Sequence, residues 1–379
     1  MATTILPFHF NLLTWFSVRC LIQWPTSIKL IYRIYSLIMF TSLISLNIFQ
    51  VAKLFFVKLE NFSDFNSLFT FNLALQAGMI KAMTFLFNEE KVDRLINMFE
   101  EDCCLAQDLF EKNIRKVYED KCIKLAKIVF FCFEILMVSF VTTPLAFDIE
   151  LRVLPYPVHL PYSLSNLVIY WLTYADHVIN CIYLGHVSLL GDLISTSFMW
   201  HLCGQLEILK HRLQKLNGKV SQFNTVSFEK QIMKECIQHH VHLYDIADAI
   251  YAAFSICIVF QFYCDALAVC MSVYQLTTMT AGVMEKLAFL SYVGMMLGRL
   301  YLVCYFGNEV VSEDLADAIF QIDWTPLSTE VKKSLLMMII RTSKPIIVSS
   351  RFFVRLMLET FIKVVKVSYS GYSLLKSSV

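Results

Sequence analysis

Hydrophobic positions in this chain gather into long runs, each close to the length of a membrane-spanning helix. A helix that crosses a bilayer needs about 20 mostly apolar residues. Runs of this kind cover residues 32–56, 65–87, 125–147, 166–190, 249–273, 286–307 and 352–375. The pattern therefore predicts an all-α membrane protein with seven transmembrane helices.

The last of these runs differs from the others because it is charged. Hydropathy alone supports six spans and leaves this one in doubt, since Glu359, Lys363 and Lys366 fall within roughly two turns of it. Ionisable side chains are costly in hydrocarbon, so they are expected to face other helices or a water-filled path. The last helix is thus a candidate pore element.

Basic residues in the connections predict the orientation. If the N-terminus is cytoplasmic, the outer connections hold only Lys53, Lys58, Arg152 and Lys286. The inner connections hold many more: Lys91, Arg94, Lys112, Arg115, Lys116, Lys210, Arg212, Lys215, Lys219, Lys230, Lys234, Lys332, Lys333, Arg341 and Lys344. The excess of inner positive charge predicts a cytoplasmic N-terminus and, with seven spans, an extracellular C-terminus. G-protein-coupled receptors have the opposite orientation.

Apolar residues also continue at helical spacing beyond the spans, as in Leu202, Leu206 and Leu209. We therefore expect helices that project into a cytoplasmic anchor domain. The predicted divisions are a cytoplasmic N-terminal segment (1–31), four transmembrane helices with an outer pocket (32–200), a cytoplasmic helical extension (201–248), two more transmembrane helices (249–307), a cytoplasmic anchor segment (308–350) and the last helix (351–379).

Composition agrees with a membrane protein and narrows its chemistry. Hydrophobic residues make up 57% of the chain and charged residues 17%, and the net charge of +1 indicates no nucleic-acid partner. The first residues hold no cleavable signal peptide pattern. The twelve cysteines are scattered without paired ligand spacing, which favours buried thiols over a metal site or a disulfide framework. Enzyme motifs are absent, and we expect no cofactor.

A set of spaced motifs near the C-terminus carries a resemblance to a known family. They are Cys304-Tyr305-Phe306-Gly307-Asn308-Glu309, Leu315-Ala316-Asp317-Ala318-Ile319-Phe320, Asp323-Trp324, Lys333-Ser334-Leu335-Leu336, Arg341, Lys344-Pro345, Phe353, Leu358-Glu359-Thr360-Phe361 and Ser368-Tyr369-Ser370. This stretch of about 75 residues resembles the C-terminal region of insect odorant receptors. Length, span number and orientation are similar as well.

The resemblance implies an odorant-gated, non-selective cation channel. In that family, a subunit tuned to particular odorants assembles with the odorant receptor co-receptor (Orco) around one central pore. The resemblance therefore implies a heteromeric channel, which we expect to be a tetramer. The implied location is the cell membrane, as a multi-pass protein in dendrites of olfactory sensory neurons. The implied ligand is a small volatile odorant.

The last helix of each subunit lines the pore in this family, which implies roles for three residues here. Leu374 matches the position of a hydrophobic gate near the outer mouth, and Ser373 and Ser370 match neighbouring pore-facing positions. Alternatively, the Ser and Tyr side chains only bond neighbouring helices. Gly371 departs from the family, which usually has a bulky residue there, so the helix is expected to bend or pack more closely at this point.

Lys363 and Lys366 would oppose cation conduction if they faced the pore. Either they point away, or Lys363 pairs with Glu359 one helical turn earlier.

Ligand recognition is expected in the outer halves of spans two to six, as in the mostly apolar cavity of the family. Candidate ligand residues are Phe69 and Asn72 in span two; Met137, Ser139, Phe140 and Thr142 in span three; Tyr170, Tyr174, His177 and Cys181 in span four; and Phe260, Tyr263 and Cys264 in span five. Aromatic stripes at helical spacing are more often core, and His177 is alternatively a bundle histidine beside Asp176. The stripe of Tyr170, Tyr174 and His177 is the preferred candidate.

Other features of the spans and connections are interpreted more generally. Pro155, Pro157 and Pro161 follow span three and are expected to stiffen a lid over the pocket. Asp265 and Arg299 lie inside spans and should have partners, in structural or gating contacts.

Two other functions remain open for this chain. One is an insect gustatory receptor-type channel, and the other is a seven-helix receptor or carrier that acts through cytoplasmic partners.

Overall fold

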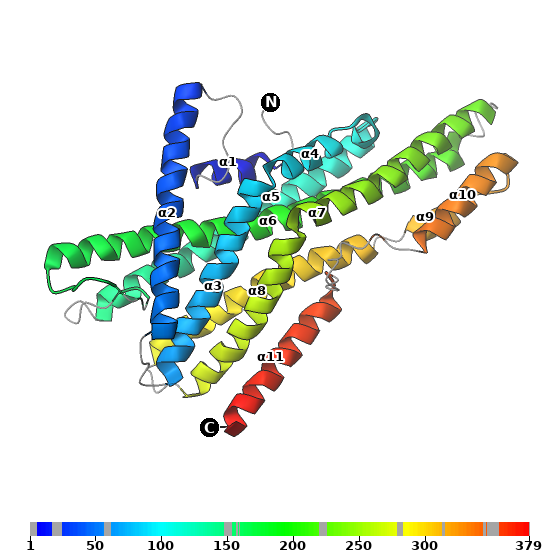
Figure 1. Cartoon of the computed structure of the whole chain (residues 1–379). Helices are drawn as coiled ribbons and strands as arrows, with labels where there is room; N and C mark the ends of the chain where they lie inside the picture. Colours follow the sequence, from blue (N-terminus) through cyan, green and yellow to red (C-terminus); the bar gives the residue numbers. More distant parts are fainter. Residues whose placement is uncertain are drawn as a thin grey trace.

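The computed structural model describes residues 6–16, 25–56, 62–147, 154–156, 158, 160–219, 226–278, 283–312, 315–343, 346 and 356–378, and this part of the chain is helical without strands. Seven of its helices correspond to the predicted spans. They are α2 (Thr26–Phe56), α3 (Phe62–Phe87), α5 (Leu109–Phe147), α6 (Leu167–Lys219), α7 (Val226–Thr278), α8 (Val283–Ser312) and α11 (Leu358–Ser378). Their ends alternate between two sides of the bundle (Figure 1).

By length and apolar composition, five helices qualify as membrane spans: α2, α5, α6, α7 and α8. The sequence indicated six, and the difference is α3. This helix carries polar residues that turn toward the bundle, with Asn72 and Gln76 half-buried and Lys81 only 2% exposed. Helix α11 carries the charged residues that already made it doubtful. Helix α3 is polar because its polar side chains face other helices of the bundle rather than lipid.

The two longest helices, α6 and α7, have 53 residues each. At 1.5 Å per residue each is about 80 Å long, more than twice the thickness of a hydrocarbon core. Their far ends form the projecting part of the molecule (Figure 1), together with α4 (Glu89–Phe99), the 3-10 helix η1 (Asp102–Cys104), α9 (Leu315–Phe320) and α10 (Thr329–Thr342). The cytoplasmic location of this projection stays a prediction.

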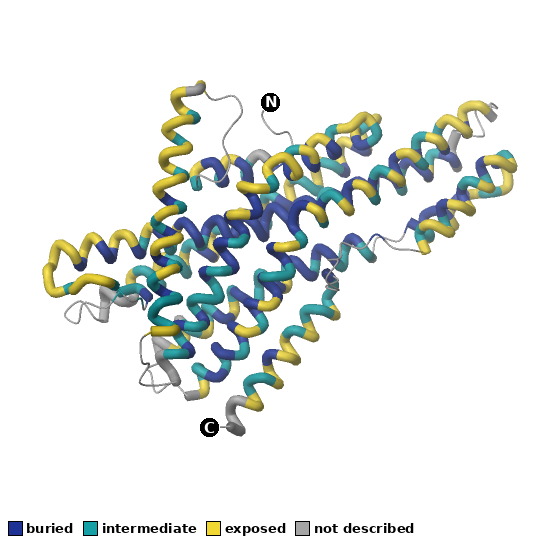
Figure 2. Tube along the Cα trace, in the orientation of Figure 1, coloured by how far each residue is buried: buried dark blue, intermediate teal, exposed yellow. Residues whose placement is uncertain are grey.

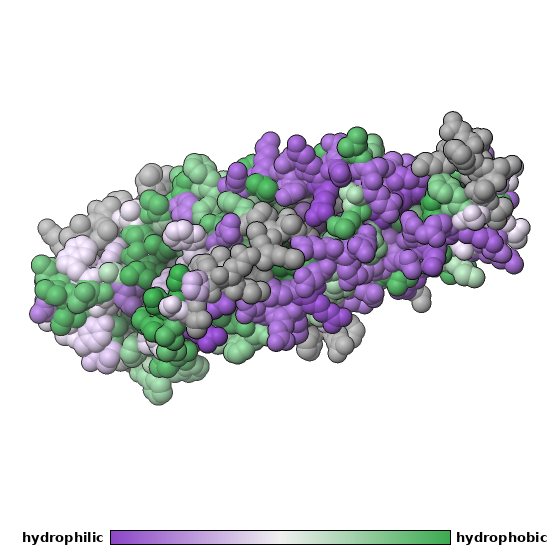
Figure 3. Space-filling view, turned by 90° about the horizontal axis from the view of Figure 1, so that it is seen from above, coloured by the Kyte–Doolittle hydropathy of each residue, from purple (hydrophilic) through white to green (hydrophobic). Residues whose placement is uncertain are grey.

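The surface shows the same division between two parts. The face in Figure 3 is hydrophobic toward one end and hydrophilic over the projecting end. In the hydrophobic part, α2 exposes apolar side chains such as Leu37 (65%) and Ile48 (59%), whereas α6 is buried through its middle (Figure 2). Exposed apolar side chains along a spanning helix are expected where lipid is the solvent.

Two details of the bundle were not expected from the sequence. A short helix, α1 (Pro7–Trp15), packs on α6 with Phe10 and Leu13 buried, so the segment 1–31 contributes to the core. Gly78 of α3 lies against Leu184 of α6, and a Cβ on Gly78 would lie 2.6 Å from the Leu184 side chain. Small residues of this kind allow close approach of helices in membranes.

In the projecting part, four charged residues join the start of α5 to α6, and we call them the extension cluster (Asp108, Glu111, Arg212 and Lys215). Arg212 Nη2 lies 2.9 Å from Glu111 Oε2, and Lys215 Nζ lies 2.8 Å from both Asp108 Oδ2 and Glu111 Oε1. Arg212 also donates to the backbone oxygens of Cys103 (2.6 Å) and Leu105 (2.7 Å). The guanidinium therefore fixes the turn around η1 to α6.

These contacts change the protonation of the cluster, which lies outside the predicted spans. Hydrogen bonding to Lys215 holds the pKa of Asp108 well below its usual range. Burial alone would raise the pKa of Glu111, but hydrogen bonds from Arg212 and Lys215 lower it overall. Burial opposes the charge of Lys215, and its bonds to the two carboxylates raise its pKa. All three groups are thus held in their charged forms.

Candidate ligand site and pore helix

Four aromatic rings stack in a column where α3, α5 and α6 meet, away from the projecting part. Tyr156, from the connection between α5 and α6, is 3% exposed and lies between His177 (centroids 4.3 Å apart) and Phe71 (4.4 Å). Phe71 in turn stacks on Phe140 at 6.2 Å. We call His177, Tyr156, Phe71 and Phe140 the aromatic column.

Tyr156 closes this column from a connection that was expected to act as a lid. Its hydroxyl donates to the backbone oxygen of His177 (3.4 Å), and burial raises the pKa of Tyr156, so the phenol stays neutral. Pro155 and Pro161 lie in the same connection, whereas Pro157 lies outside the described residues. A tyrosine between two prolines was the available sequence signal for Tyr156, and neither Tyr156 nor Phe71 was among the predicted ligand residues.

The preferred stripe on α6 is buried as a unit. Tyr170, Tyr174 and His177 are 2%, 4% and 2% exposed, and the Tyr174 hydroxyl donates to the backbone oxygen of Val141 at 2.8 Å. His177 Nδ1 has no hydrogen-bond partner among the described residues. Cys181, one turn further, is half-buried. The stripe thus faces the bundle and leaves a buried imidazole nitrogen available.

The candidates on α3 and α5 divide into two groups. Phe69, Asn72, Met137 and Phe140 are half-buried, and Asn72 Nδ2 also lacks a partner within the described part. Ser139 and Thr142 are exposed, and the Thr142 hydroxyl bonds its own helix at Val138 O (2.8 Å). Phe140 belongs to the aromatic column, and Ser139 and Thr142 face outward in this chain.

The candidates on α7 are also divided. Phe260 is half-buried, Cys264 is 4% exposed, and Tyr263 is 63% exposed. Tyr263 therefore faces away from the bundle that holds the other two.

Two of the cavities in the described structure are not lined by the candidate ligand residues. The larger, of about 190 Å³, lies between α5, α6 and α8 and is lined by Lys121, Cys122, Leu125, Ala126, Leu193, Thr196, Ser197, Trp200, Tyr305 and Phe306. The smaller, of about 20 Å³, lies near Phe99 and His201.

Deeper in the bundle, four charged side chains meet, and we call them the membrane cluster (Lys81, Asp192, Asp265 and Arg299). Lys81 Nζ lies 2.6 Å from Asp192 Oδ1, and Arg299 lies 3.5 Å from Asp265 Oδ1 and 3.9 Å from Asp192 Oδ2. Ser188 Oγ accepts from Lys81 (3.2 Å) and Arg299 (3.0 Å), and Gln261 donates to Asp265 (3.2 Å). The cluster joins α3, α6, α7 and α8.

The membrane cluster supplies the partners that Asp265 and Arg299 required. Lys81 and Asp192 were not identified from the sequence as these partners, and Asp192 lies two residues beyond the predicted span 166–190. Charges of opposite sign in different spans indicate pairing, because an unpaired charge in hydrocarbon is costly.

Helix α11 packs on α7 and α8 through one face. The Ser368 hydroxyl donates to Ala266 O of α7 (2.9 Å), and a Cβ on Gly371 would lie 2.8 Å from Cys270 Sγ. Gly371 therefore allows α11 to lie close to α7, which explains the departure at this position. Ser370, Ser373 and Leu374 lie on the exposed part of the helix, Leu374 with 71% exposure.

The charged residues of α11 are on its exposed surface as well. Lys363 Nζ lies 2.7 Å from Glu359 Oε1, and both side chains are 68% exposed. This is the pair at i and i+4 that the sequence offered as an alternative to a pore-facing lysine. Lys366 is exposed too.

Two further sequence features are the cysteines and a glycosylation sequon. The eleven cysteines in the described part of the chain are free thiols; seven are buried, whereas Cys132 is exposed and Cys103, Cys181 and Cys270 are half-buried. Asn61, the acceptor of the sequon Asn61-Phe62-Ser63, lies outside the described residues.

Comparison with solved structures identifies the same helical arrangement elsewhere. The insect olfactory receptor OR5 from Machilis hrabei in complex with eugenol matches with a TM-score of 0.82 at 14% identity, covering 98% of this chain and 100% of that one. The structure of OR5 from Machilis hrabei described without eugenol matches with a TM-score of 0.78 at 15% identity, covering 97% and 98%. The predicted fold class, an all-α membrane protein with seven transmembrane helices, is confirmed.

Sequence comparisons agree with the structural one. Putative odorant receptor 92a of Drosophila melanogaster is 24% identical over 217 residues, which are 56% of this chain and 52% of that relative. Odorant receptor 13a of the same organism is 22% identical over 252 residues, 61% and 59% of the two chains. The chain spans about half the length of the curated relatives it matches. The family described as 7tm Odorant receptor matches residues 61–369, most of the chain. The chain therefore belongs to the insect odorant receptor family.

Proposed function

We propose that this chain is the odorant-binding subunit of an odorant-gated, non-selective cation channel, assembled with the odorant receptor co-receptor. The observation that carries the proposal is the division of α11 into two faces. One face is fixed to α7 through Ser368 and Gly371, and Leu374, Ser373 and Ser370 lie exposed on the rest of the helix. An apolar side chain flanked by hydroxyls is suited to a dewetting gate in a ring of subunits.

In this proposal the odorant binds at the aromatic column. A small, uncharged volatile inserts beside Tyr156 and stacks on the faces of Phe71 and His177, and His177 Nδ1 and Asn72 Nδ2 give it polar contacts. The eugenol complex of the structurally similar OR5 supports a ligand of this size and class. Displacement of Tyr156 then separates α6 from α3 at their outer ends.

The movement reaches the pore helix through the membrane cluster. His177 and Asp192 lie on one helix about 22 Å apart, and Phe71 and Lys81 lie about 15 Å apart on another. Asp265 of the cluster is next to Ala266, whose backbone oxygen accepts from Ser368 of α11. A shift of α3 or α6 therefore changes the position of α7, and with it the position of α11.

The test is current recorded from cells that express this chain with the co-receptor, across a panel of volatiles. We expect Tyr156→Ala and Tyr174→Ala to shift the odorant concentration for half-maximal current by about tenfold or more, with normal surface expression. Leu172→Ala, on the exposed side of α6 (67%), is the matched control and should leave it unchanged. Equal dose responses in all four proteins would contradict the proposed site.

The gate is tested in the same cells. Leu374→Ser should raise the basal current or change ion selectivity, because a hydroxyl wets a closed apolar ring. Ile362→Ser, also exposed on α11 (51%) but three turns earlier, is the control. Unchanged currents for Leu374→Ser would contradict the gate.

The proposed orientation has its own test. An epitope tag after Val379 should be reached by antibody on intact cells, and staining only after permeabilisation would contradict the proposed orientation.

A further inference from the structure

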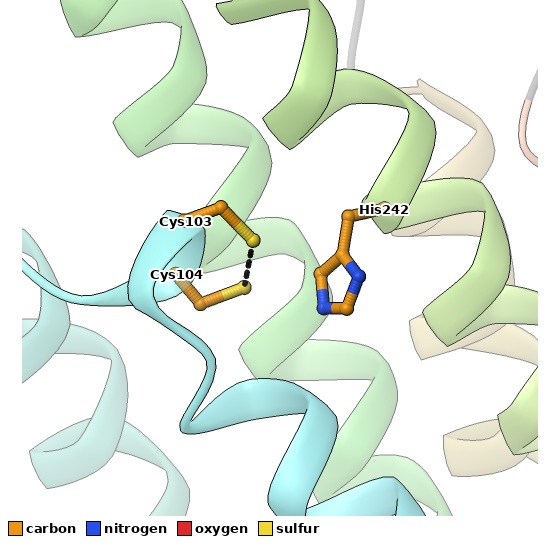
Figure 4. A group of neighbouring side chains, drawn as sticks. All are labelled: Cys103, Cys104 and His242. Atoms are coloured by element: carbon orange, nitrogen blue, oxygen red, sulfur yellow. Dashed lines mark hydrogen bonds between the residues drawn. The ribbon is translucent and has the colours of Figure 1, made fainter. Parts of the chain in front are cut away.

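Three potential metal ligands converge where η1 meets α7 in the projecting part of the molecule. Single ligand atoms of Cys103, Cys104 and His242 all lie within 4.8 Å of one another, and the two sulfurs are 4.0 Å apart. Figure 4 shows both thiols and one ring nitrogen of His242 turned toward a common point. The sequence hid this group because 137 positions of chain separate the thiols from the imidazole.

The distances are close to those of a tetrahedral zinc site. Zinc–sulfur bonds of about 2.3 Å place two thiolates about 3.8 Å apart, and a thiolate and an imidazole nitrogen about 3.6 Å apart. The observed sulfur separation already matches, and the imidazole must approach by about 1 Å at most. Thiolate and imidazole are the ligands that zinc prefers among protein side chains.

The imidazole of His242 is oriented by oxygen atoms on both of its nitrogens. Nε2 lies 2.8 Å from Met98 O, and Nδ1 lies 3.4 Å from Glu101 Oε2. A carboxylate that accepts from Nδ1–H leaves the Nε2 lone pair for a metal, and such carboxylate–histidine pairs are typical of zinc sites. Met98 O then becomes available as a fourth oxygen ligand, unless water takes that place.

The backbone that carries the thiols is also held in place from α6. Cys103 O accepts from Arg212 (2.6 Å), and Cys104 O accepts from Gln205 (3.1 Å). Cys104 is fully buried and Cys103 is half-buried, so an ion has an entry path on one side only. A ligand set on a fixed backbone needs little reorganisation to bind an ion.

We propose that Cys103, Cys104 and His242 bind one zinc ion, with Glu101 orienting the imidazole. The ion bridges the connection before α5 to α7, two segments that are otherwise joined through hydrogen bonds. Binding replaces the thiol protons and keeps the imidazole neutral, so zinc stabilises the projecting part. On the predicted cytoplasmic side both thiols remain reduced and available.

The first test is metal content of the purified full-length chain, prepared with a non-thiol reductant and passed through gel filtration with a weak chelator. Wild-type protein should retain about one zinc per chain, and Cys103→Ser/Cys104→Ser and His242→Gln should each retain at least tenfold less. Cys132→Ser, an exposed cysteine elsewhere, and His211→Gln, from the acidic group with Asp108 and Glu111, are matched controls that should retain it. Equal retention in all variants, or none in the wild type, would overturn the proposal.

A second test needs no variant and therefore does not depend on their folding. Cobalt(II) added to the metal-free wild-type protein should produce thiolate-to-cobalt charge-transfer absorption and the intense visible bands of tetrahedral cobalt, both removed by stoichiometric zinc. A cobalt spectrum without charge-transfer absorption would overturn the proposal. So would mass spectrometry of unreduced protein that finds Cys103 and Cys104 joined in a disulfide.

Discussion

The membrane cluster and the extension cluster each combine two acidic with two basic side chains, yet their geometry differs. In the extension cluster the ion pairs measure 2.8–2.9 Å, and Arg212 also bonds two backbone oxygens. In the membrane cluster only Lys81 and Asp192 are that close (2.6 Å), and Arg299 lies 3.5 Å and 3.9 Å from its carboxylates.

Two atoms of the membrane cluster, Asp192 Oδ2 and Arg299 Nε, also lack hydrogen-bond partners among the described residues. When buried charges are loosely paired, the observed pairing and the alternative pairings are close in free energy, because each charge can exchange one partner for another. A cluster with short ion pairs therefore fixes the relative positions of the helices that it joins, whereas a cluster with longer ion pairs permits those helices to move. We infer that the extension cluster holds the projecting helices and that the membrane cluster rearranges during gating.

The largest expected effect comes from breaking the tight cluster. Arg212→Met leaves the fully buried Glu111 with Lys215 as its one remaining basic partner in the cluster and frees two backbone oxygens, which should cost about 3 kcal/mol of folding free energy. Little folded protein should be recovered, as measured by fluorescence-detected size exclusion in detergent. Lys210→Ala, which removes a more exposed pair with Glu207 (3.6 Å), is the control and should be recovered normally. Normal recovery of Arg212→Met would contradict the structural role.

A smaller effect is expected from the one tight pair of the membrane cluster. Asp192→Asn leaves Lys81, 2% exposed, beside an amide, and should lower the thermal midpoint by more than Asp265→Asn does. The reason is that Arg299 keeps Asp192 as a partner when Asp265 is neutral, whereas Lys81 has no second carboxylate within salt-bridge distance among the described residues. Thermal unfolding of both variants in the same detergent measures the difference. The reverse order would contradict the geometry of the cluster.

The smallest effect is a dependence of the thermal midpoint on pH that comes from the carboxylates of the extension cluster. The folded pKa values of Asp108 and Glu111 are lowered, so their contribution to stability is present above their ordinary pKa values near 4 and is lost as pH falls through the lower folded values. The thermal midpoint should begin to fall below about pH 7, because burial lowers the pKa of His239 to about 3 and of His240 to about 4 in the folded chain, and it should fall further below about pH 5 as the carboxylates become protonated. Asp108→Asn should show a shallower fall. An identical pH profile for this variant would contradict the assigned pKa shift.

Much of the fold was predictable because hydrocarbon imposes long apolar runs on spanning helices. Each of the seven predicted spans corresponds to one helix, but α5, α6 and α7 extend well beyond their spans at one end, α2 begins at Thr26 and α11 begins at Leu358. Periodicity also indicated that α6 continues beyond the bilayer, through Leu202, Leu206 and Leu209. It could not indicate that α1 packs on α6, because a nine-residue helix carries little periodic signal.

The candidate site was only partly predictable, because it depends on which faces of separate helices meet. His177 and Phe140 were named and lie in the aromatic column, but Tyr156 comes from a connection where no periodicity applies. Tyr263 has the helical spacing of a pocket residue and yet is 63% exposed, because the orientation of α7 is set by its contacts with α3 and α6. Contacts between distant segments, such as Arg299 with Asp265, have no local pattern.

The most direct test of the account is the odorant-evoked current of Asp265→Asn in cells that express the co-receptor. The variant removes one carboxylate from the loose cluster and leaves Arg299 with Asp192. We expect wild-type surface expression and a shift of about tenfold in the odorant concentration for half-maximal current, because the coupling between site and pore helix has changed. Glu134→Gln, which removes a carboxylate from the pair with His186 (2.6 Å), is the control. An unchanged dose response for Asp265→Asn, at full surface expression, would contradict the claim that the membrane cluster transmits ligand binding to α11.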